Sequence, residues 1–116
     1  MIGIDIIEID RIKTALERTK SFYQKAFTQY EREYYEKNGR KIQTLAGFFC
    51  AKEAAVKALQ TGFNGIGLQD LEIRHTPSGS PYLVFLGKAK ELLKDRTVEV
   101  SISHSQNYAV AVCLIK

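Results

Sequence analysis

The stretch from Lys41 to Leu59 constrains the fold most, because Gly47 is its only helix breaker. Its larger apolar side chains are available for a core: Leu45, Phe48, Phe49, Val56 and Leu59. This pattern predicts one long helix that ends before Gly62. Gly47 costs roughly 1 kcal/mol relative to alanine in a helix interior, so we expect it to permit a close approach by backbone or ligand.

Within this helix, Glu53 and Lys57 lie one turn apart, which places an acid and a cation on one face. On an exposed helix such a pair is an ordinary ion pair worth roughly a few tenths of a kcal/mol. A second acidic segment favours another interpretation, because Asp5 and Glu8 stand inside an isoleucine-rich run near the N-terminus. Two carboxylate sites far apart in the sequence suggest a metal site, with the surface ion pair as the alternative.

The first residues predict a strand followed by a basic helix. Residues 2 to 7 are mostly β-branched, so we expect a strand with Asp5 on the same face as Gly3 and Ile7. From about residue 8 the apolar residues take helical spacing, which leaves Arg11 and Arg18 to project outward.

The remaining elements follow from caps, alternation and turn residues. Thr28 and Glu31 match a capping box that begins a Tyr-rich helix, and Asn38 and Gly39 supply its end. Further along we expect strands at 71–75, 82–86, 98–103 and 108–115, a short helix at 88–94, and turns at 77–81 and 104–107. The last strand is almost entirely apolar, which predicts burial on both faces.

Composition limits the class of protein. The chain has 116 residues, of which 45% are hydrophobic and 26% charged, so we expect one globular domain over residues 1–116. Seventeen Lys and Arg against thirteen Asp and Glu give a net charge of +4, which favours an acidic partner or a phosphorylated ligand. The cations of the first twenty residues form either a docking face for an anionic surface or a solvated helix face: Arg11, Lys13, Arg18 and Lys20.

The two cysteines and the hydrophobic profile predict location. Cys50 and Cys113 fit neither a zinc motif nor a disulfide framework, so we interpret them as small buried hydrophobic residues. Acidic residues interrupt the N-terminal isoleucine run, and no segment approaches 18 apolar residues. We therefore expect a reducing, cytoplasmic location and no membrane partner.

The chemistry-bearing residues favour a hard cation. Magnesium typically takes one or two carboxylates and completes its shell with water and phosphate oxygens, which suits Asp5 with Glu53. Lys57 beside such a site would stabilise charge on a phosphate.

No P-loop or dinucleotide fingerprint is present. The loop from Gly62 to Gly67 could present backbone N–H groups to a phosphate, or it could be a plain connection between elements. His104 could contact a phosphate, or it could be a turn residue without a ligand.

Several segments together resemble one family. They are the Gly3 to Ile9 run with Arg11 and Ile12, the Lys-Glu-Ala core of Phe49 to Ala58, Gly62, the turn Gly79-Ser80-Pro81-Tyr82, and Val100 to Ser105. In order and spacing they are similar to holo-acyl-carrier-protein synthases, the short bacterial 4'-phosphopantetheinyl transferases. The resemblance runs over nearly the whole chain.

The resemblance implies a small α+β fold with a long central helix packed on an antiparallel sheet, assembled as a homotrimer with sites between subunits. It implies transfer of 4'-phosphopantetheine from coenzyme A to a serine of apo-acyl carrier protein in fatty acid biosynthesis, with release of adenosine 3',5'-bisphosphate. Asp5 and Glu53 match the Mg²⁺ ligands, Lys57 matches the cation beside the departing phosphate, and Glu8 matches an acidic position nearby. A carboxylate or a metal-bound hydroxide would take the proton of the serine.

The resemblance also implies binding residues and shows two departures. Coenzyme A contacts match Lys57, Gly62, Gly79, Pro81 and His104. Arg11 matches the docking position for the acidic carrier protein, with Arg18 on the same basic helix. Phe48 and Ser80 stand where relatives often carry Arg and Lys, so two basic phosphate contacts are missing from the sequence.

Two other functions are compatible with parts of the sequence. A small basic nucleic-acid-binding domain would suit the net charge and the six Tyr and six Phe, but no RNP-like strand or GXXG loop is present. A non-catalytic adapter for carrier protein would keep the basic helix. The presence of Asp5, Glu53 and Lys57 favours an enzyme over that adapter.

Overall fold

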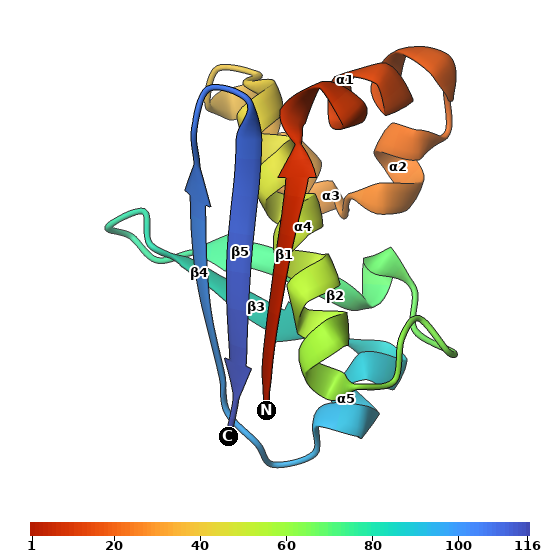
Figure 1. The fold of residues 1–116 in the computed structure, drawn as a ribbon, viewed down its shortest axis with the longest axis vertical. Coiled ribbons are helices and arrows are strands. Elements are labelled where there is room, and N and C mark those ends of the chain that lie inside the picture. The colour runs from red at the N-terminus through yellow and green to blue at the C-terminus, as the bar shows by residue number, and fades with distance from the viewer.

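A three-stranded antiparallel sheet and one long helix form the centre of the molecule (Figure 1). The structure is a computed structural model that describes residues 1–116. The sheet has the order β1-β5-β4, with β1 at Ile2–Glu8, β5 at Tyr108–Ile115 and β4 at Val98–His104. Helix α4 (Ile42–Leu59) covers one face of this sheet, as the long central helix of the sequence prediction requires.

The other elements surround α4. A hairpin of β2 (Leu71–His75) and β3 (Pro81–Phe85) crosses behind the sheet, and α5 (Gly87–Leu93) follows it. Three helices gather beyond the end of β1, namely α1 (Ile9–Arg18), α2 (Phe22–Ala26) and α3 (Gln29–Lys37). The predicted strands and helices are confirmed to within a residue or so at their ends. Helix α2 and the 3-10 turn η1 (Leu68–Asp70) were not predicted, because elements of five and three residues carry too little periodicity.

The start of α3 follows the capping box read from the sequence. The Thr28 hydroxyl accepts a hydrogen bond from the Glu31 backbone, and the Glu31 carboxylate accepts one from the Thr28 backbone at 2.8 Å. Glu31 is fully buried, and its second oxygen accepts from the Ile73 backbone at 2.7 Å. One residue therefore caps α3 and ties it to β2.

Lys52 completes this buried network from α4. Its ammonium donates to the Glu31 carboxylate at 2.6 Å and to the carbonyls of Ala26 and Leu68, both at 2.9 Å. Both side chains of the ion pair are fully buried. Burial raises the pKa of Glu31 and lowers that of Lys52. Together these bonds join α2, α3, α4, η1 and β2, and they fix the rotation of α4 about its axis.

Gly3 sets the distance between β1 and α4. A methyl group built on it would lie 2.0 Å from the carbonyl oxygen of Ala54 and 2.6 Å from the amide nitrogen of Ala58. The strand and the helix therefore touch backbone to backbone. Gly47, where a close approach was predicted, has one such neighbour, the Ile102 side chain at 3.0 Å.

The outer face of the sheet corrects one prediction. The alternate residues of β5 that face α4 are buried, but Val110, Val112 and Leu114 on the other face are only partly covered. Ile2, Ile4 and Ile6 of β1 share this outer face and are 61–66% exposed. The expectation that β5 is buried on both faces is therefore wrong for this chain by itself, because no element of the chain covers this face.

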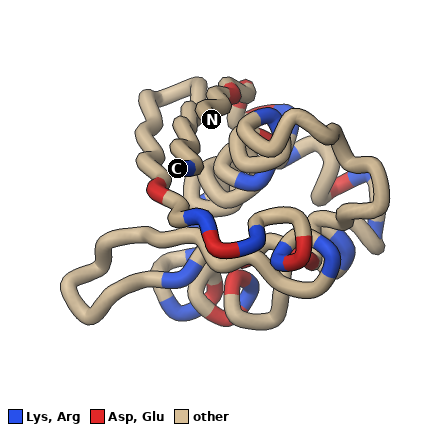
Figure 2. The backbone as a smooth tube through the Cα atoms, turned by 90° about the horizontal axis from the view of Figure 1, so that it is seen from below, with Lys and Arg blue, Asp and Glu red and all other residues tan.

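Charged residues are concentrated away from the sheet. In Figure 2 the strands near the two termini are mostly tan, and the blue and red positions lie mainly on the helices and loops. Strand β5 contains no charged residue. No helix is both long enough and apolar enough to cross a membrane.

Candidate functional site

Asp5 and Lys57 meet where β1 packs on α4. Asp5 lies on the strand face that it was predicted to share with Gly3 and Ile7, and this face meets α4. Its Oδ1 accepts a hydrogen bond from Lys57 Nζ at 2.9 Å. Lys57 Nζ also donates to the Ile4 carbonyl at 3.1 Å. This bond to Asp5 raises the pKa of Lys57, which keeps the side chain cationic. The surface ion pair between Glu53 and Lys57 considered from the sequence is wrong, because Lys57 pairs with the strand instead.

Glu53 lies beside this pair without an ion-pair partner of its own. It shares with Asp5 a cavity of about 340 Å³ at the junction of β1, α1, α2 and α4. Burial raises the pKa of Glu53, and the negative charge of Asp5 raises it further. Two carboxylates thus face one cavity, and only Asp5 of the two has a cation within ion-pair distance.

Cys50 is a member of this group that sequence reasoning missed. Its Sγ donates to Asp5 Oδ2 at 3.3 Å and lies 3.5 Å from the carbonyl oxygen of Ala109. Burial, followed by the hydrogen bond to Asp5 and its charge, raises the pKa of the Cys50 thiol to about 12. A signal was present in the sequence, since Cys50 precedes Glu53 by three positions and Lys57 by seven, which places all three on one helix face.

The wall of the cavity away from the carboxylates is apolar and has one cation. Arg11 of α1 lines it with Ile12 and Ala15, and the rings of Phe22 and Phe49 close it. Arg18 lies seven positions after Arg11, on the same side of α1, and is exposed in the last turn of the helix. Phe22 comes from the helix that was not predicted. Glu8 was placed near this site, but strand alternation puts it on the exposed opposite face of β1, outside the cavity lining.

The carboxylate pair fits a hard divalent cation and does not fit zinc. No three side chains of His, Cys, Asp or Glu gather around one point. Zinc sites need three or four such ligands, whereas magnesium is commonly held by one or two carboxylates with water and phosphate oxygens. The pKa of Glu53 is raised by burial and by the charge of Asp5. A cation bound between the two carboxylates would lower it, because the positive charge favours their ionised forms.

A second cavity lies on the other flank of α4. It has a volume of about 160 Å³ and is lined by Tyr34, Gln43, Thr44, Gly47, Phe48, His75, Pro81, Ile102 and His104. His75 is stacked on Tyr34 with ring centres 3.8 Å apart and packs against Phe48 at 5.7 Å. Its Nδ1 is buried without a hydrogen-bond partner, and burial lowers its pKa. No Lys or Arg lines this cavity.

The predicted site residues therefore fall into separate groups. Asp5, Glu53 and Lys57 come together, whereas Pro81 and His104 line the second cavity, which shares no residue with the first. Gly62 and Gly79 lie in exposed loops with positive φ of 62° and 91° and no atom within 4 Å of an added methyl. The chain alone does not bring the two predicted halves of the site together.

Comparison with known proteins gives one consistent family. The family model described as the 4'-phosphopantetheinyl transferase superfamily matches residues 1–113. A holo-[acyl-carrier-protein] synthase of Clostridium tetani is 43% identical over 118 residues, covering 99% of this chain and 94% of that protein. One of Clostridium beijerinckii is 44% identical over 117 residues, covering 99% and 95%.

Solved structures agree with these relatives. The Helicobacter pylori holo-[acyl-carrier-protein] synthase in complex with coenzyme A has a TM-score of 0.88 at 30% identity and covers both chains completely. The Bacillus anthracis synthase in complex with CoA (3',5'-ADP) has a TM-score of 0.83 at 35% identity, covering 98% of this chain and 93% of that one. The α+β fold expected from the sequence is confirmed.

Proposed function

The chain belongs to the 4'-phosphopantetheinyl transferase superfamily, and we propose that it transfers 4'-phosphopantetheine from coenzyme A to a serine of apo-acyl carrier protein. The second product is adenosine 3',5'-bisphosphate. The observation that carries the proposal is that Asp5 and Glu53 share one cavity and that Lys57 is hydrogen-bonded to Asp5, in a chain 43% identical to a holo-[acyl-carrier-protein] synthase. We further propose that residues 1–116 act as one domain, in the cytoplasm, for fatty acid biosynthesis.

Asp5 and Glu53 would hold Mg²⁺, which when bound supplies positive charge to the pyrophosphate oxygens of coenzyme A. Lys57 adds a cation, and it would stabilise the charge that gathers on the departing phosphate. The hydroxyl of serine is a poor nucleophile, so its proton must leave as its oxygen attacks phosphorus. A carboxylate of the cavity or a metal-bound hydroxide would take this proton, and Asp5 and Glu53 are the carboxylates that line the cavity.

Arg11 and Arg18 would orient the carrier protein. Both belong to α1, and Arg11 also lines the cavity that contains Asp5 and Glu53. An acidic segment of the carrier lying along α1 would be attracted by both cations, and this would aim its serine at the cavity. The rings of Phe22 and Phe49 beside Arg11 offer an apolar contact for the same segment.

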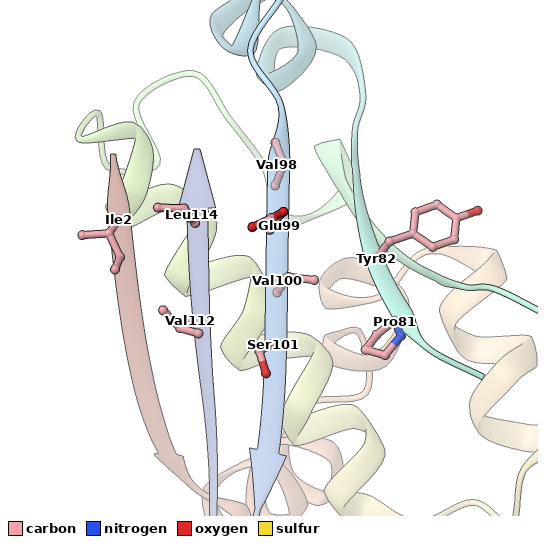
Figure 3. A pocket seen from close by; sticks show the side chains of 9 residues that line it. All are labelled: Ile2, Pro81, Tyr82, Val98, Glu99, Val100, Ser101, Val112 and Leu114. Carbon is pink, nitrogen blue, oxygen red and sulfur yellow. The ribbon is translucent and has the colours of Figure 1, made fainter. Parts of the chain in front are cut away.

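We propose a homotrimer with active sites shared between subunits. The exposed sheet face with Ile2, Ile4 and Ile6 supports this assembly, because such a face is unusual on a monomer. Val112 and Leu114 continue the face toward β4, where a hollow of about 550 Å³ opens beside Pro81 and Tyr82 (Figure 3). A neighbouring copy on this face could also bring its His104 cavity close to the Asp5 cavity, whereas the two cavities are separate within a single chain.

Sedimentation should give three copies per particle, and a monomer at micromolar concentration would contradict the assembly.

Intact mass spectrometry tests the activity directly. Purified protein, coenzyme A, Mg²⁺ and an apo-acyl carrier protein should give a carrier that is heavier by one phosphopantetheine group. A carrier with its acceptor serine replaced by alanine is the matched control and should gain nothing. No mass gain on the intact carrier would reject the proposed function, and salt-dependent binding of RNA without any turnover would then favour the nucleic-acid alternative.

A further inference from the structure

The carboxylate of Asp5 is held on both of its oxygens by residues of α4. Lys57 Nζ contacts Oδ1 at 2.9 Å, and Cys50 Sγ contacts Oδ2 at 3.3 Å. The two partners are seven positions apart, so they lie two turns apart along one face of the helix. Each oxygen of the Asp5 carboxylate therefore has its own partner on α4, and Glu53 lies between these two partners in the sequence.

The two partners differ in rigidity. The Lys57 side chain is 54% exposed and ends a flexible four-carbon stem, and its charge is also the one suited to the phosphate of the donor. Cys50 is fully buried, has a single side-chain torsion to its sulfur, and lies one helical turn before Ala54, where Gly3 brings β1 and α4 into backbone contact. When Lys57 turns toward a donor phosphate, Cys50 is the partner that still restrains Asp5.

The acceptor of the thiol proton follows from charge and distance. Cys50 has one S–H and two candidate acceptors, Asp5 Oδ2 at 3.3 Å and the carbonyl oxygen of Ala109 at 3.5 Å. The carboxylate is nearer and charged, and hydrogen bonds to charged acceptors are roughly twice as strong as those to neutral ones. The thiol therefore donates to Asp5, and Ala109 confines the sulfur from the other side.

We propose that Cys50 is a positioning residue for the transfer reaction, which orients the Asp5 carboxylate toward the divalent cation. The inference rests on the proposed function for the identity of that cation. Hydrogen bonds that orient a metal-binding carboxylate are typically worth 10- to 100-fold in metal affinity or activity. Because a thiol is a weak donor, we expect the lower end, about 10-fold.

Cys50→Ala and Cys50→Ser test the role, with Cys113→Ala as the matched control. Cys113 is the other fully buried cysteine, on β5 opposite Gly3, and it has no contact with Asp5. Binding of Mn²⁺, followed by electron paramagnetic resonance with coenzyme A and without carrier, should weaken about 10-fold in Cys50→Ala. Cys50→Ser restores a donor and should bind close to the wild type, as should Cys113→Ala.

A second readout needs no metal. In crystal structures of the metal-free proteins, the Asp5 carboxylate should stay in one conformation in Cys50→Ser and become disordered in Cys50→Ala. Wild-type Mn²⁺ affinity with an ordered Asp5 in Cys50→Ala would overturn the inference, as would Cys50→Ser behaving like Cys50→Ala, since cavity formation alone would then explain both. A wild type without transfer activity would reject the proposed function, while the order of Asp5 would still decide the role of Cys50.

Discussion

Replacing Gly3 by alanine should separate the two elements on which the site depends. Gly3 lies two residues before Asp5 on β1, and it touches the backbone of α4 at Ala54 and Ala58. The helix carries Glu53 and Lys57 in the same turn. A methyl group at residue 3 therefore acts on the spacing of the three site residues through its contacts with the backbone of Ala54 and Ala58.

The size of the effect follows from two distances. The added carbon would lie 2.0 Å from the Ala54 carbonyl oxygen, whereas ordinary contact begins at 3.4 Å, so strand and helix must separate by 3.4 − 2.0 = 1.4 Å. Neither side can rotate away, because both are backbone, and β1 is paired with the central strand β5 along its whole length. Overpacking of a core by methylene-sized groups costs about 1–3 kcal/mol, and we expect about 3 kcal/mol here.

Urea unfolding measures this loss, with Gly67→Ala as the control. Gly67 has a negative φ of −105°, and an added methyl there meets nothing closer than 3.9 Å, so its change should stay within about 0.5 kcal/mol. Transfer by Gly3→Ala should also fall at temperatures where the variant is folded, since a shift of about 1 Å at a site can cost about 100-fold in rate. A Gly3→Ala protein as stable as Gly67→Ala and as active as the wild type would refute the reasoning.

Three further predictions concern other parts of the chain. Lys52→Met should lower the free energy of unfolding by about 3–5 kcal/mol, because it leaves Glu31 buried and unpaired, and adding Glu31→Gln should recover part of the loss in urea unfolding. Burial lowers the pKa of His75, so its contribution to stability is complete above pH about 6.5 and is lost as the pH falls. Between pH 7 and pH 5 the free energy of unfolding should therefore fall less steeply in His75→Phe than in the wild type. Arg11→Glu should weaken carrier binding at least 10-fold by calorimetry and leave coenzyme A binding nearly unchanged, and equal losses of both would argue against docking on α1.

Much of the fold could be predicted from the sequence because its elements carry strong local signals. The β-branched run of β1, the capping box of α3 and the breaker-free α4 each depend on residues close together in the chain. The buried ion pair of Lys52 and Glu31 could not be predicted, since it joins residues 21 positions apart on elements whose packing is set by the whole core. The exposed outer face of β5 was not predicted for a related reason. An apolar strand is expected to be buried, but its sequence does not say whether the same chain or another chain packs on it.

The sequence predicted most of the residues of the candidate site but not which of them contact one another. Asp5, Glu53 and Lys57 were selected from the sequence, and the structure brings them together. Helical spacing suggested that Lys57 pairs with Glu53, but the close contact that Gly3 permits brings Asp5 near enough to take the lysine. Cys50 was interpreted only as a hydrophobic residue, because a hydrogen bond between a thiol and a distant strand carboxylate leaves no periodic signal.

The most direct test of the central claim compares the wild type with Asp5→Asn and Glu53→Gln. Both variants keep the size of the side chain and remove one negative charge, so circular dichroism should confirm that they are folded. With coenzyme A, Mg²⁺ and apo-acyl carrier protein, the wild type should release one adenosine 3',5'-bisphosphate for each carrier that gains a phosphopantetheine, and both variants should give neither product at the same Mg²⁺ concentration. Wild-type turnover by either folded variant would contradict the account.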